Sequence, residues 1–66
     1  MKSTIQRNMK ISEIADVLKS HGIDTAYGWQ IVLWGVFNSF ETDELIVEGI
    51  GAFATLRAPS KEEVTQ

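Results

Sequence analysis

The fold is decided by the stretch Leu45-Ile46-Val47-Glu48-Gly49-Ile50-Gly51-Ala52-Phe53-Ala54-Thr55-Leu56-Arg57. An apolar run opens this stretch and an alternating pattern closes it, and both are typical of short strands. Gly49 and Gly51 lie between them, and glycine accepts the backbone angles of a tight turn. The stretch therefore predicts a β-hairpin.

Residues 12–20 predict the first of two helices before this hairpin. Ser12 is a candidate N-cap, and apolar side chains recur at the spacing of one helical face, at Ile11, Ile14, Ala15 and Leu18. Gly22 follows, and glycine readily takes the left-handed conformation that ends a helix. We expect a structural or capping role for His21, since a helix C-terminus favours an imidazolium.

Residues 25–40 predict the second helix, with Asp24 as its N-cap. One apolar stripe contains Ala26, Trp29, Leu33, Val36, Phe37 and Phe40, and a second contains Tyr27, Ile31 and Trp34. Such a helix is apolar nearly all round and must bury more than one face. We therefore expect a homodimer whose interface contains Trp29, Leu33, Trp34, Val36, Phe37, Phe40 and Phe53. Gly28 and Gly35 either permit close helix approach or are merely tolerated.

The expected organisation is one domain at residues 9–58, between a flexible leader at residues 1–8 and a polar tail at residues 59–66. Both end segments are polar, and disorder concentrates at chain ends. The expected fold class is α+β, with two N-terminal helices followed by a β-hairpin.

The composition argues against several classes of protein. The 66 residues include no cysteine and one histidine, so we expect no metal and no cofactor. The formal net charge of −3 weakens any reading as a phosphate-backbone binder and fits a basic partner. The longest apolar run is far below the ~20 residues that cross a bilayer, and residues 1–8 lack the apolar segment of a signal peptide. We therefore expect no membrane association and a cytoplasmic location.

The sequence contains no catalytic signature. The serines lack the G-x-S-x-G pattern of a nucleophile, and no helix follows Gly49-Ile50-Gly51 as a dinucleotide loop would require. We expect a protein that is not an enzyme and has no small-molecule substrate. Candidate phosphate contacts are Lys10, Arg57 and Lys61, although scattered surface charges are the commoner case.

Three segments together resemble the bacterial HU/IHF histone-like DNA-bending family. Residues 9–18 resemble that family's opening helix, residues 22–24 the turn before its dimer-forming helix, and residues 46–53 its strand-turn-strand signature. The resemblance covers residues 9–57, with Ile50 where the family usually has phenylalanine. The sequence ends before the positions of the family's long basic β-arms. The resemblance thus implies an HU/IHF-like dimerisation core that lacks the arms which enter the minor groove.

Alternatives remain for both fold and function. A winged helix-turn-helix would use the same helices and hairpin, but a recognition helix needs polar and basic side chains, and residues 25–40 contain no lysine or arginine. The first functional hypothesis is a small dimeric module that associates weakly with DNA or nucleoprotein. The second is an acidic, phage-type inhibitor or modulator that binds a host protein, such as a nucleic-acid-binding protein.

Overall fold

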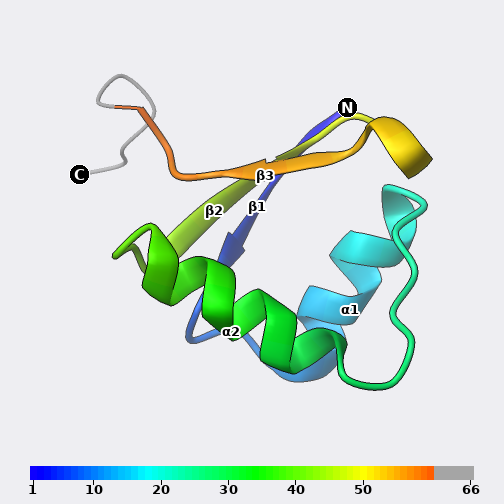
Figure 1. Cartoon of the computed structure of the whole chain (residues 1–66). Coiled ribbons are helices and arrows are strands. Elements are labelled where there is room, and N and C mark those ends of the chain that lie inside the picture. The colour runs from blue at the N-terminus through cyan, green and yellow to red at the C-terminus, as the bar shows by residue number, and fades with distance from the viewer. Residues whose placement is uncertain (61–66) are drawn as a thin grey trace.

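The computed structural model describes residues 1–60, which form a three-stranded antiparallel sheet with two helices on one side of it (Figure 1). The elements in chain order are β1 (Lys2–Gln6), α1 (Ile11–Ser20), α2 (Trp29–Ser39), β2 (Glu44–Glu48), a 3₁₀ turn (Gly51–Phe53) and β3 (Thr55–Arg57).

The sheet has the order β1-β2-β3, so β2 is its central strand. In the β1–β2 pair, Lys2 lies opposite Glu48 and Gln6 lies opposite Glu44. In the β2–β3 pair, Val47 lies opposite Leu56. The first residues of the chain and the residues after the 3₁₀ turn therefore lie on either side of the same strand.

The expected order of two helices followed by a hairpin is wrong, because residues 2–6 form a strand rather than part of a flexible leader. The reason lies in β2, where Leu45, Ile46 and Val47 are all buried. β2 is paired along both edges, with β1 on one and β3 on the other, and this central position leaves none of its three apolar side chains exposed. The winged-helix alternative also lacks the N-terminal strand, because it consists of the same two helices followed by a hairpin.

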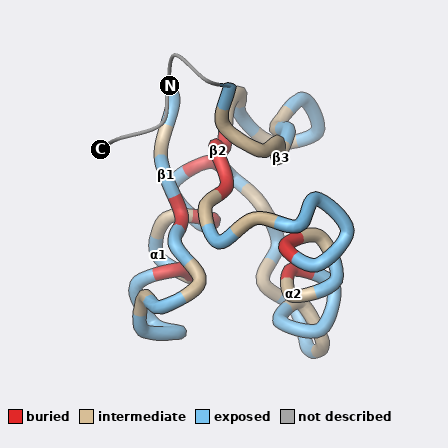
Figure 2. The backbone as a smooth tube through the Cα atoms, turned by 90° about the vertical axis from the view of Figure 1, so that its left-hand side faces the viewer, coloured by how far each residue is buried: buried red, intermediate tan, exposed pale blue. Residues whose placement is uncertain are grey.

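The hydrophobic core lies between the sheet and the two helices (Figure 2). Phe37 of α2 and Ile14 of α1 are fully buried there, as is Ile5 of β1. The remaining buried members of this cluster are Leu18, Leu33, Leu45 and Val47. Both α-helices and the strands β1 and β2 thus each contribute a fully or almost fully buried side chain to one core.

The predicted first helix is confirmed as α1, which begins one residue earlier than expected. Its N-cap is Lys10 rather than Ser12, and the Lys10 N–H donates to the Glu13 carboxylate at 3.3 Å. Gly22 follows the helix with φ +74°, as expected for a left-handed cap. The Ile23 N–H donates to the Leu18 carbonyl at 3.0 Å, which completes a Schellman motif.

The second helix is shorter than predicted at its N-terminus. α2 begins at Trp29, after Gly28 with φ +92°, so Asp24 is not its N-cap. Because the Schellman motif folds Ile23 back onto α1, the following residues must first cross to the start of α2. At the other end Glu41 takes φ +51°, a left-handed conformation that an L-residue with a side chain rarely adopts.

The predicted turn at Gly49 and Gly51 is part of a longer connection. Both glycines have positive φ, but residues 51–53 form the 3₁₀ turn, so the second strand of the hairpin begins at Thr55 rather than at residue 52. The Gly51 N–H donates to the His21 carbonyl at 2.7 Å and so ties this connection to the end of α1.

Candidate functional site

The residues expected at a dimer interface divide into three groups. Leu33 and Phe37 lie in the core of the single chain, and Trp29, Trp34 and Val36 are half-buried against that core. Phe40 and Phe53 are exposed, to 47% and 87%. Most of the residues expected to contact a second copy are therefore packed in the core of the single chain or against it.

The side of α2 that points away from the sheet carries apolar side chains that no described residue covers. Ile31 is 78% exposed and Val32 is 68% exposed, and Gly35 lies one helical turn further along. We call Ile31, Val32 and Gly35 the outer face of α2. Ile31 belonged to a predicted stripe, whereas Val32 was in neither stripe. Its spacing of three residues from Gly35 could have indicated a shared face.

The outer face carries no charge, because α2 itself contains no lysine, arginine, aspartate or glutamate. A built Cβ at Gly35 would meet nothing within 4 Å, so another backbone could approach the helix closely at this point. Exposed apolar area without charge is typical of a surface that binds another molecule.

An apolar groove of about 330 Å³ lies beside the outer face. Residues from the end of α1, the α1–α2 connection, α2 and β3 line it, among them Leu18, Ile23, Asp24, Trp29, Leu33 and Leu56. Tyr27, which is fully exposed, and Val32 also line it, so the groove and the outer face share an edge. Sequence reasoning missed this groove because its walls come from elements whose positions depend on the sheet.

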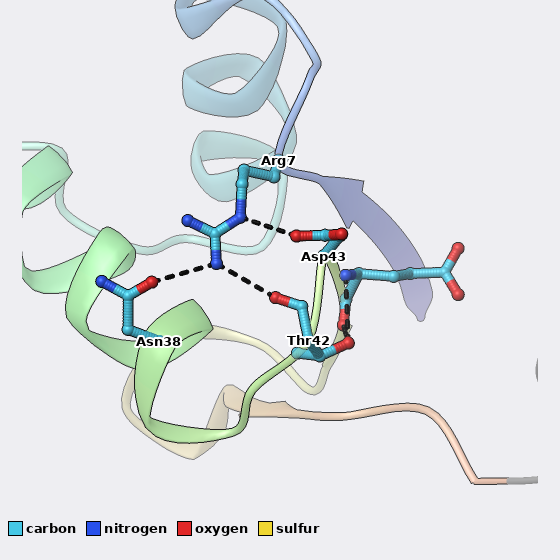
Figure 3. Close-up of polar contacts among 5 residues, drawn as sticks. Arg7, Asn38, Thr42 and Asp43 are labelled. Carbon is cyan, nitrogen blue, oxygen red and sulfur yellow. Dashed lines mark hydrogen bonds and ion pairs between the residues drawn. The ribbon is translucent and has the colours of Figure 1, made fainter.

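Arg7 makes polar contacts with three residues from the end of α2 and the turn that follows it (Figure 3). Its Nε donates to Asp43 Oδ1 at 2.8 Å, and its Nη2 donates to Asn38 Oδ1 at 3.1 Å and to the Thr42 carbonyl at 3.2 Å. The guanidinium carbon lies 5.0 Å from the centre of the Phe37 ring. This contact set joins the end of β1 to the end of α2 and to the turn before β2.

His21 is fully buried and both of its ring nitrogens have partners. Nδ1 lies 2.7 Å from the Gly49 carbonyl oxygen, and Nε2 lies 2.8 Å from Ser3 Oγ. Because a carbonyl can only accept, Nδ1 carries a proton, and in the neutral ring Nε2 accepts from the Ser3 hydroxyl. The ring thus joins α1 to β1 and to the end of β2, in agreement with the structural role expected for it. Within residues 1–60, no three histidine, aspartate or glutamate residues form a group that could hold a metal ion.

Two of the three candidate phosphate contacts, Lys10 and Arg57, lie at different elements. Lys10 precedes α1, and Arg57 lies on β3 with its Nε 2.6 Å from Glu48 Oε1. Lys61 lies outside the described residues. The structure thus describes two of the three candidates, and they lie at different elements.

Over residues 1–60, neither helix has the length and apolar character needed to cross a bilayer. The chain matches no family model, and it matches no curated protein and no solved structure. The expected HU/IHF-like dimerisation core is wrong as a fold, because β1 precedes the two helices and completes the sheet. The resemblance of residues 9–18, 22–24 and 46–53 to that family stays a prediction.

Proposed function

We propose that the protein is a binding module without catalytic activity, and that it works as a homodimer formed through the outer face of α2. The observation that carries this proposal is the pair of exposed side chains Ile31 and Val32 on an uncharged helix. Full burial of each would contribute about 1.5–3 kcal/mol of transfer free energy. A chain of 66 residues has a small core, so such an interface would add substantially to its stability.

Charge and symmetry favour a second copy as the occupant of this face. In a two-fold interface the same patch meets itself, so a charged side chain close to the axis would oppose its own copy. The chain has a net charge of −3, yet α2 contributes no charged side chain to such a contact. A standard interface covers about 800 Å² per partner, roughly a sixth of the 4607 Å² that the chain exposes.

The same charges favour a basic protein over DNA as the external partner of this module. With Lys61, Glu62 and Glu63 left out, residues 1–60 carry five cations and seven acids. Two of those cations, Arg7 and Arg57, are paired with Asp43 and Glu48. Binding to a phosphate backbone depends on cations that replace condensed counterions. The reading that these observations support is thus an acidic modulator of another protein.

Sedimentation equilibrium over a range of concentrations tests the homodimer. The wild-type chain should approach twice its mass of 7.4 kDa as concentration rises. Ile31→Asp should keep the fold and remain at the monomer mass, because it places a charge at the centre of the interface. Gln30→Asp is the matched control, since it adds the same charge to a neighbouring exposed position outside the outer face. A wild-type protein that stays at 7.4 kDa at every concentration would exclude the homodimer.

A further inference from the structure

We propose that the apolar groove between α1, α2 and β3 binds a segment of a basic protein, with one large apolar side chain in the groove and an adjacent lysine or arginine against Asp24. This inference rests on the proposed function as a protein-binding module. It adds the chemistry of the partner and a second site, which shares only Val32 with the outer face of α2.

The groove has the form of a preformed pocket for one apolar side chain. Leu18 and Leu33, each 4% exposed, belong to the core and supply its floor, and Leu56 of β3 adds a further apolar side chain. The Schellman motif after α1 fixes Ile23 beside Leu18. A volume of about 330 Å³ is at the lower end of the range for ligand pockets, which are mostly apolar with a few polar groups at defined positions.

The negative charge at the groove favours a positively charged partner. Within residues 1–60, Asp24 is the one acidic side chain that lines it, and no lysine or arginine does so. Among the described residues Asp24 is exposed and has no ion-pair or hydrogen-bond partner. Trp29 lines the same groove, and cations are attracted to the face of an indole ring. A phosphate or a carboxylate at this position would face Asp24 without any compensating cation.

Three synthetic peptides of equal length test this chemistry. The first has a central phenylalanine flanked by lysines, the second has the same phenylalanine flanked by glutamates, and the third has alanine in place of phenylalanine between lysines. The readout is the ¹H–¹⁵N spectrum of the full chain, with the Trp29 indole N–H and the Leu56 amide as reporters. We expect the first peptide to shift both signals and to bind at least about fivefold more tightly than either of the others.

Two variants separate Asp24 from the overall negative charge. Asp24→Asn should make the lysine and glutamate peptides bind alike, while the preference for phenylalanine over alanine remains. Asp16→Asn removes the same charge from an exposed position on α1 that does not line the groove, and it should leave the preference for lysine intact. Equal loss of that preference in both variants would overturn the inference, and so would equal affinity of the wild-type protein for the lysine and glutamate peptides.

The same titration on Ile31→Asp distinguishes this inference from the homodimer, because Ile31 does not line the groove. Peptide binding by a monomeric Ile31→Asp chain supports the groove site whatever the oligomeric state of the wild type. Shifts of the groove signals on dilution of the Ile31→Asp chain without peptide would assign the groove to a second copy. Shifts caused by a short DNA duplex in place of the lysine peptide would assign it to nucleic acid. Either result would overturn the proposal.

Discussion

A side chain at position 49 has no room in this fold. A Cβ built on Gly49 would lie 2.5 Å from the carbonyl oxygen of Phe53, and the φ of +89° is itself unfavourable for an L-residue. Gly49→Ala should therefore lower the free energy of unfolding by more than about 2 kcal/mol, measured by urea denaturation.

Gly51→Ala provides the control for this substitution. Gly51 also has a positive φ, of +60°, but a Cβ there would meet nothing within 4 Å. Gly51→Ala should therefore lower the free energy of unfolding by about 1–2 kcal/mol, which is the cost of the left-handed conformation alone. Equal destabilisation by the two substitutions would show that the contact with Phe53 does not exist.

The C-terminus of α2 ends in a turn with a left-handed residue that is not glycine. The Thr42 N–H donates to the Phe37 carbonyl at 3.1 Å, and the Glu41 N–H donates to the Asn38 carbonyl at 3.2 Å. This is a Schellman motif with a glutamate at the left-handed position that glycine usually occupies. Glu41→Gly should therefore raise the free energy of unfolding by about 0.5–1 kcal/mol. The check is the urea midpoint, with Glu41→Ala as the variant that removes the charge and keeps the strain.

The sequence could predict the elements that are determined by the pattern of their own residues. The apolar spacing from Ile11 to Leu18 and the glycine at position 22 defined α1 and its end, and the run Leu45–Val47 defined β2. The N-terminal strand could not be found in this way. Its five residues, Lys2 to Gln6, contain one core side chain among polar ones, and their strand conformation depends on pairing with β2 about 40 residues later.

The candidate site shows the same division between local and long-range signals. The excess of apolar residues on the second helix was visible in the sequence, and with it the expectation of a partner. Which of these residues face outward was not visible, because the sheet decides which side of α2 is covered. Leu33 and Phe37 were expected at an interface and lie in the core, whereas Val32 was not singled out and is exposed. The groove depends on β3 and on the chain reversal at Ile23, and neither position follows from helical periodicity.

At the scale of the whole molecule, the fold depends on the pairing of the first residues with the strand that follows both helices. Ile5 is fully buried in the shared core, while its neighbour Thr4 is exposed on the same strand. Ile5→Ala should lower the free energy of unfolding by about 2–4 kcal/mol, because it leaves a cavity where β1, β2 and the helices meet. Thr4→Ala should change it by less than about 1 kcal/mol. Hydrogen exchange supplies the second measurement, since loss of β1 would expose the amides of β2 that face it. If Ile5→Ala matched Thr4→Ala in both measurements, residues 1–8 would be the flexible leader that their polar composition suggests, and the central position of β2 would be refuted.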